Sequence, residues 1–320
     1  MTDIYLRESL AARIKTRINS MPYVLLLVTT ITWAGHVVIA KGIAGSIPPV
    51  SLAFWRSFFA CLILLPLGWP RLRRDWPVIR RSLPILILIS APAVALFNTF
   101  LYLAVQTTTA INVSLISTTM PAVIIILSRL ILRHRIGSHQ VAGLLLSFTG
   151  ALLVIVRGDW HTLAGLVFVR GDLWMVAAVS STALYSVLLH YRPPIHALSL
   201  TLMMFIIGVL LLLPPYLWEW FRGAGFEVTP AVAASIAYIA LFPSVIAYFC
   251  WNRGIQLVGA SRAGLLMHFV PVFVAILAYL FLGEVLHWYH PVGLVLILAG
   301  VFMFNRRRMA ESAPGAAAHE

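Results

Sequence analysis

Two pairs of polar side chains, each an asparagine and a tyrosine four residues apart, interrupt long apolar segments. Asn98 and Tyr102 form the first pair, and Tyr248 and Asn252 form the second with the order exchanged. Residues four apart share one helix face, and polar side chains in a bilayer face partners or water rather than lipid. We therefore predict that these amides and phenols contact a substrate. The alternative is that each asparagine only joins neighbouring helices, a contribution on the order of 1 kcal/mol.

Aromatic and hydroxyl-bearing residues form a second candidate lining. Trp33 and His36 share a stripe of the first apolar segment, and Tyr185 lies on the matching segment of the second half. The faces of Trp33 and Tyr185 can stack on an organic molecule or contact an ammonium group. The alternative is ordinary packing between helices.

Prolines occur in the middle of two apolar segments. Pro121 and Pro271 each free a carbonyl group four residues earlier and so predict a kink and a hinge. Ser114 and Thr118 precede the first proline, and His268 precedes the second. Prolines are also common in membrane helices that gate nothing.

Few ionisable residues lie within or at the edges of the apolar segments. Lys41 either meets a carboxylate at a cavity mouth or extends toward the interface. Arg56 should be capped by carbonyl groups or form an outer gate contact. His36 and His268 form either a proton-coupling pair or plain hydrogen bonds. The predicted gating and hinge residues are Lys41, Arg56, Pro121 and Pro271. The predicted substrate contacts are Trp33, His36, Asn98, Tyr102, Ser114, Thr118, Tyr185, Tyr248, Asn252 and His268.

The composition places these residues in a membrane. Hydrophobic residues make up 61% of the chain and charged residues 10%, and the mean hydropathy is +0.95. A span needs about 20 apolar residues, and ten segments qualify. The predicted spans are 21–40, 50–69, 83–104, 110–132, 138–156, 172–190, 197–218, 231–251, 262–282 and 288–305.

The chain repeats itself at a spacing of 150 residues. The segment 106–150 aligns without a gap on 256–300, with glycines and prolines in register. The aligned identities include Gln106 with Gln256, Pro121 with Pro271, Gly143 with Gly293 and Gly150 with Gly300. The glycine pairs predict close packing of two helices. A five-helix unit has been duplicated, giving repeats at 21–156 and 172–305.

The positive charges predict the topology. The net charge of +13 does not indicate nucleic acid, because Lys and Arg fall mostly on the side of the membrane that holds the N-terminus. The opposite side holds Lys41, Arg157, Arg170 and Arg222. The positive-inside rule then places both termini in the cytoplasm, and five helices per unit make the second repeat inverted. We expect residues 1–20 to form a basic interfacial helix and residues 306–320 a cytoplasmic tail.

Three stretches resemble a known family. The run PPVSLAFWRSFFACLILL, the stretch from Leu101 to Gly150 and its copy ending LGEVLHWYHPVGLVLILAG are similar to the EamA domain of the drug/metabolite transporter superfamily. The resemblance implies an all-α membrane protein of ten helices, two inverted five-helix repeats around a central cavity, and transport by alternating access. It also implies that the fifth and tenth helices are peripheral. The family's acidic residue is present as Glu284, but His134 stands at the matching position of the first half.

We therefore predict a carrier of the bacterial inner membrane that exports small organic solutes, with amino acids or related metabolites as substrates. No Asp or Glu lies near the middle of a predicted span, which favours facilitated diffusion or exchange over a carboxylate proton relay. We predict neither a cofactor nor nucleotide hydrolysis, because no GxxxxGK[ST] run occurs. The bilayer and the solute are the predicted partners, and the sequence leaves the oligomeric state open.

Two other functions stay open at this stage. A nucleotide-sugar or phosphorylated-metabolite exchanger would need several cations facing its cavity, for which only Lys41 and Arg56 are candidates. An integral membrane enzyme would need a cluster such as His287 and His290 beside Glu284.

Overall fold

The computed structural model describes residues 21–133, 138–159, 169–258, 266–267 and 269–311. The interfacial helix predicted for residues 1–20, most of the predicted tail, and His134 lie outside the described residues. Within the described ranges the secondary structure is helical apart from a bridge between Ala44 and Ile47.

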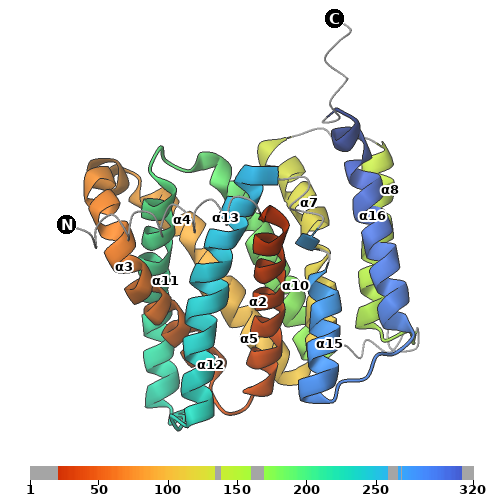
Figure 1. Ribbon diagram of the computed structural model, residues 1–320, viewed down its shortest axis with the longest axis horizontal. Helices are drawn as coiled ribbons and strands as arrows, with labels where there is room; N and C mark the ends of the chain where they lie inside the picture. The colour runs from red at the N-terminus through yellow and green to blue at the C-terminus, as the bar shows by residue number, and fades with distance from the viewer. Residues whose placement is uncertain (1–20, 134–137, 160–168, 259–265, 268, 312–320) are drawn as a thin grey trace, which may run out of the picture.

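The helices run through the chain in the order shown in Figure 1. In the first half they are α2 (Pro22–Gly42), α3 (Pro49–Arg81), α4 (Leu83–Ser90), η1 (Ala91–Leu96), α5 (Phe97–Thr107), α6 (Ala110–Ser117), α7 (Met120–Leu132) and α8 (Ser138–Ile155). In the second half they are α10 (Arg170–Leu188), η2 (Leu189–Tyr191), α11 (Ala197–Phe221), α12 (Pro230–Leu241), η3 (Phe242–Ile246), α13 (Ala247–Val258), α15 (Val270–Leu282) and α16 (Tyr289–Glu311).

Six helical stretches of the described chain are long and apolar enough to cross a membrane. A seventh forms if α6 and α7, which are bent by 41°, count as one span. The other predicted segments correspond to shorter apolar helices at Val141–Ile155, Val270–Leu282 and Tyr289–Gly300. The structure thus shows an all-helical membrane protein, and the count of ten spans stays a prediction.

The second helix is longer than the sequence predicted. We expected a connection from Trp69 to Ser82, but α3 continues to Arg81 through Pro66, Pro70 and Pro77. Prolines disfavour a helix interior. Here packing on α11 outweighs that preference: Leu72 and Ile79 are buried, and the Asp75 carboxylate accepts a hydrogen bond from the backbone of His196 just before α11.

Helices α8 and α16 pack tightly on each other at one end of the molecule (Figure 1). A Cβ added at Gly150 would lie 2.7 Å from the carbonyl oxygen of Gly293, and one at Gly300 would lie 2.4 Å from that of Gly143. The close backbone approach predicted from the glycine spacing is therefore confirmed.

Two helices contain a π-helical turn at corresponding places in the two halves. The segment η1 separates α4 from α5, and η3 separates α12 from α13; each begins with a proline at its first or second position, Pro92 and Pro243. Each π turn comes directly before one of the asparagine–tyrosine pairs. Such turns shift the register of a helix and occur often at functional sites.

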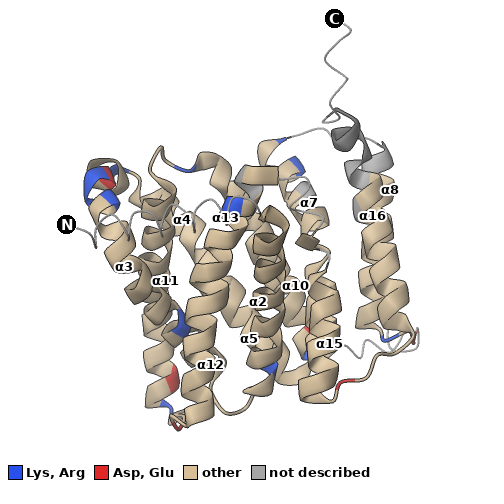
Figure 2. Ribbon diagram, viewed as in Figure 1, with Lys and Arg blue, Asp and Glu red and all other residues tan. Residues whose placement is uncertain are grey.

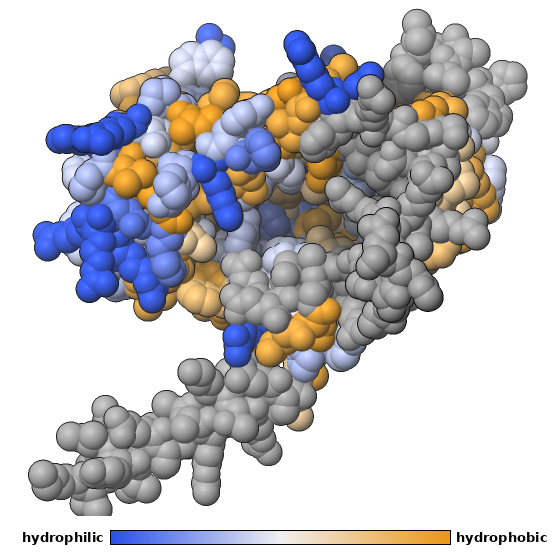
Figure 3. Space-filling model, turned by 90° about the horizontal axis from the view of Figure 1, so that it is seen from above, coloured by the Kyte–Doolittle hydropathy of each residue, from blue (hydrophilic) through white to orange (hydrophobic). Residues whose placement is uncertain are grey.

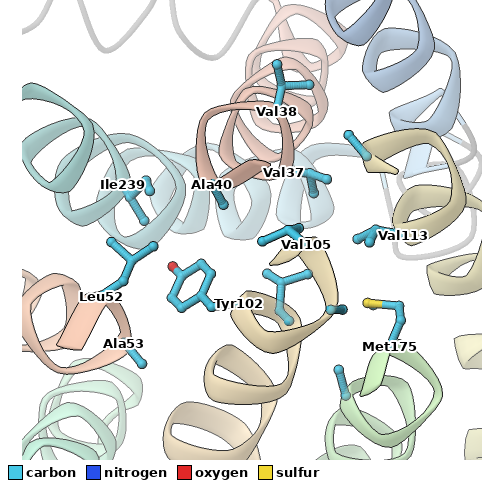
Figure 4. Packing of buried hydrophobic residues seen from close by; sticks show 14 of the residues in the cluster. Val37, Val38, Ala40, Leu52, Ala53, Tyr102, Val105, Val113, Met175 and Ile239 are labelled. Carbon is cyan, nitrogen blue, oxygen red and sulfur yellow. The ribbon is translucent and has the colours of Figure 1, made fainter. Parts of the chain in front are cut away.

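The buried core surrounds Tyr102, whose side chain is fully buried. Figure 4 shows its ring beside Leu52 and Ala53 of α3, with Ile239 of α12 nearby. Apart from buried Arg56 and Asp172, charged residues gather mainly at the ends of the bundle (Figure 2). Most blue segments lie at the end where the described chain begins and ends.

Candidate functional site

A buried arginine connects three helices beside the polar pair of the first half. Arg56 of α3 is 6% exposed. Its Nη1 donates to Asn98 Oδ1 of α5, and its Nη2 donates to Ser244 Oγ of η3 over 2.6 Å. The sequence predicted that carbonyl groups cap Arg56. In the structure its acceptors are the side-chain carbonyl of Asn98 and the hydroxyl of Ser244.

The π-helical turns hold both acceptors in place. Asn98 Nδ2 donates to the carbonyl of Val94 in η1 at 2.7 Å. Ser244 Oγ also donates to the carbonyl of Ile239, at 2.8 Å. The network leaves the Nε–H of Arg56 without a hydrogen-bond partner. A positive charge therefore lies inside the protein with neutral partners only.

His36 and Tyr102 form a second buried contact next to the arginine. His36 Nε2 lies 2.9 Å from the Tyr102 hydroxyl, and the rings meet edge to face with centroids 5.7 Å apart. Both side chains are within electrostatic range of Arg56. The structure thus brings together four residues that the sequence singled out: His36, Arg56, Asn98 and Tyr102.

Aromatic side chains adjoin this cluster. Trp33 Nε1 donates to the carbonyl of Pro243 at 3.3 Å, and its ring lies 5.6 Å from that of Trp251. Trp251 was missed because a tryptophan near the end of a span is typical of an interfacial anchor. Tyr248 lies within electrostatic range of both Tyr185 and Arg56.

The molecule is hollowed between these helices on one face. Figure 3 shows a central depression with pale blue, white and orange surface inside it, on the face that is uppermost in Figure 1. Tyr248, four residues beyond the serine that accepts from Arg56, is 40% exposed. We infer that Tyr248 borders this hollow, because it is exposed and lies four residues beyond Ser244, which Arg56 contacts.

At the opposite end of the bundle, two carboxylates cap helix starts. Glu284 accepts hydrogen bonds from the backbone N–H groups of Ala110 and Ile111, at 2.7 and 3.1 Å, at the start of α6. Glu219 accepts from the N–H and hydroxyl of Ser51, at 2.9 and 2.7 Å, at the start of α3. Both carboxylates belong to the second half and cap helices of the first half, where the helix dipole favours a negative charge.

Lys41 lies at the same end of the bundle (Figure 2). Its Nζ donates to the carbonyl of Val105 over 2.9 Å and is within electrostatic range of Glu284. The direct partner is a backbone carbonyl, so both predicted alternatives, a carboxylate at the cavity mouth and extension toward the interface, stay predictions.

A third polar cluster surrounds Asp172, which is fully buried. One carboxylate oxygen accepts hydrogen bonds from Thr108 and Asn112, and the other has no partner. The Asn112 Oδ1 lies 3.2 Å from His290 Nε2. The sequence placed Asp172 at a helix end and therefore did not predict its burial, which depends on the packing of α10 against α6.

The predicted hydroxyl contacts are engaged locally. Ser114 donates to Ile111 of its own helix at 2.8 Å, and Thr118 donates to Leu115 at 2.6 Å. Hydroxyls bonded in this way often bend a helix, and the helix does break here, between α6 and α7.

The two predicted hinge prolines begin half-helices. Pro121 lies in the first turn of α7, directly after the 41° bend, and Pro271 lies in the first turn of α15. A kink at Pro121 is therefore present. The prediction for His268 and the side-chain prediction for Asn252 fall outside the described residues.

Comparisons with known proteins give matches along the whole chain. The sequence profile of the EamA-like transporter family matches residues 20–156 and again residues 169–306. The uncharacterized transporter YyaM of Bacillus subtilis is 29% identical over 287 residues, covering 87% of this chain and 92% of its own length. A probable terminal-alkyne amino-acid exporter of Streptantibioticus cattleyicolor is 27% identical over 305 residues, covering 91% and 96%.

A solved crystal structure shows similarity of fold alone. It aligns with a TM-score of 0.59 and 18% sequence identity, over 92% of this chain and 99% of that one. The two profile matches are the stronger finding, because together they cover all the helices described above except the last residues of α16. The chain belongs to the EamA-like transporter family of multi-pass membrane proteins.

Proposed function

We propose that this protein is a secondary carrier that exports small organic solutes, with amino acids or related metabolites as its substrates. The observation that carries the proposal is the convergence of Trp33, Tyr185, Tyr248 and the Arg56 network beside a hollow. Binding sites for organic molecules combine aromatic walls with a few fixed polar groups. The relative named as an amino-acid exporter supports the same substrate class.

The proposed architecture is ten helices in two inverted five-helix repeats around a central cavity. Two separate matches of the family profile support the duplication. The clustering of positive residues at one end (Figure 2) supports an orientation with both termini in the cytoplasm of a bacterial inner membrane. In this orientation the hollow opens toward the cytoplasm.

We further propose that transport proceeds by alternating access. The capped end of the bundle would be the closed outer gate. Hydrogen bonds of Glu219, Glu284 and Lys41 would hold it closed. Opening this gate would require both carboxylates to leave the helix ends they cap. The half-helices that begin near Pro121 and Pro271 supply the hinges.

The alternative functions have less support. Phosphorylated substrates need several cations, and Arg56 is the one buried Lys or Arg among the described residues. The enzyme alternative relied on His290, whose Nδ1 accepts from the backbone N–H of His287 and whose Nε2 faces Asn112. Both ring nitrogens therefore have partners within the fold.

Counterflow in proteoliposomes tests the proposal. Vesicles loaded with unlabelled amino acid should accumulate tritiated amino acid from outside without an imposed ion gradient. No counterflow with any member of a panel of amino acids and related metabolites would refute the carrier proposal. Uptake that depends absolutely on a pH gradient and disappears in His36→Ala would refute the uncoupled mechanism.

A further inference from the structure

The guanidinium of Arg56 is a buried positive charge without an anion. Both hydrogen-bond partners in the structure are neutral, and no described Asp or Glu forms an ion pair with it. Buried charges in proteins are normally paired, because desolvation strongly disfavours an isolated ion. In a membrane span the same imbalance marks a functional group.

The unsatisfied donor of Arg56 lies beside the helix formed by η3 and α13. Its Nε–H is buried without a partner, its Nη2 donates to Ser244, and Tyr248, four residues beyond Ser244, is 40% exposed. Asn98 and Ser244 belong to two different helices and together fix the orientation of the side chain. A fixed guanidinium with free donors matches a carboxylate, which it can bind through two parallel hydrogen bonds.

The neighbouring groups fit the rest of such a molecule. The hydroxyls of Tyr102 and Tyr248 can donate to a carboxylate oxygen. The paired rings of Trp33 and Trp251 offer apolar surface, and their π faces attract an ammonium group. A compound with a carboxylate, an ammonium group and an apolar side chain would satisfy each of these groups.

Resting on the proposed transport function, we propose that Arg56 binds the carboxylate of the substrate, so that the substrates are monocarboxylates and α-amino acids in particular. The substrate then supplies the anion that the protein lacks at this position. Asn98 and Ser244 hold the guanidinium in the empty carrier and orient it for the incoming carboxylate.

Binding to the purified full-length chain tests this assignment directly. The probes are L-phenylalanine, its methyl ester and 2-phenylethylamine. All three have a phenyl ring and an amino group, but only L-phenylalanine has a free carboxylate. L-leucine serves as a second acid. The wild type should melt at a higher temperature with the acids and should bind the ester and the amine at least about tenfold more weakly. Arg56→Gln should lose this preference.

Because Arg56→Gln removes a buried network and can fail to fold, a second variant tests the idea in a folded protein. Asn98→Asp places a carboxylate beside the guanidinium, so the protein supplies the anion itself. This variant should keep or raise its melting temperature and yet lose stabilisation by L-phenylalanine. Ser57→Ala is the matched control. It lies on the same helix as Arg56, and the buried hydroxyl that it removes has no hydrogen-bond partner. It should behave as the wild type does.

Three results would overturn the assignment: equal binding of acid and ester by the wild type, no binding of any acid, or unchanged acid binding by Asn98→Asp. Counterflow separates this failure from failure of the proposed function. If the carrier moves uncharged or cationic solutes but no carboxylate, the assignment to Arg56 is wrong and the transport function stands. If acids bind but nothing exchanges, the anion site stands and the carrier proposal fails.

Discussion

The Glu284 carboxylate accepts a hydrogen bond of 2.7 Å from the backbone N–H of Ala110, although 174 residues separate them. The contact joins the second half of the chain to the first turn of α6. The orphan N–H groups at a helix start are strong donors, and the helix dipole adds to the attraction. This end of the bundle is therefore held by charge as well as by packing.

Glu284→Gln should weaken this contact without removing side-chain volume. We expect a loss of about 1 kcal/mol in stability, because a neutral amide accepts hydrogen bonds from a helix start less strongly than a carboxylate. The measurement is thermal unfolding in detergent. Glu227→Gln changes an exposed acid and should have no effect; an equal loss in both variants would contradict the capping role.

Glu219 and Ser51 allow a double-mutant cycle at the other cap. The hydroxyl of Ser51 lies 2.7 Å from the Glu219 carboxylate, so the variants Ser51→Ala and Glu219→Gln should be coupled. We expect a coupling energy of about 0.5–1.5 kcal/mol from unfolding midpoints. Strictly additive effects would show that the contact contributes nothing.

Tyr102→Phe should destabilise the protein by about 1–3 kcal/mol, because it leaves His36 buried without its partner. The ring itself keeps its place in the core, so packing is preserved. Tyr279→Phe removes the hydroxyl of a side chain that is 62% exposed and serves as the control. Similar unfolding temperatures for the two variants would contradict a structural role for the hydroxyl.

Gly150→Ala should separate α8 from α16. The added methyl group would overlap backbone atoms of Gly293 and Ile297, and overpacking of this kind costs about 1–3 kcal/mol. Gly225→Ala is the control, because a Cβ there meets no described atom within 4 Å. Expression and thermal unfolding compare the two. A fully stable Gly150→Ala variant would show that the helices can shift apart freely.

Helix faces were the part of the site that the sequence predicted well. Asn98 and Tyr102 share the interior face expected from their spacing of four, and both are buried. Their partners were not predicted, because Arg56 and His36 belong to other helices and reach them only through packing. Local periodicity determines which way a residue faces, but it does not determine which residue it meets.

The errors have the same origin. Pro70 and Pro77 fall in the connection predicted between 69 and 82, yet α3 continues through them because α11 stabilises it. Position near a helix end gave no indication that Glu219 and Asp172 find partners in other helices. The π turns also escaped prediction, since a proline alone does not distinguish a kink from an added residue in a turn.

The π turns η1 and η3 have a mechanical consequence. Each turn contains one residue more than an α-helical turn. If such a turn converted to α, everything beyond it would rotate by about 100° around the helix axis, one residue's share of a turn. This rotation would turn the side chains of Asn98, Tyr102 and Tyr248 toward or away from the hollow without bending either helix. Each half of the molecule thus contains, directly before its polar pair, a π-helical turn whose conversion to α would rotate that pair.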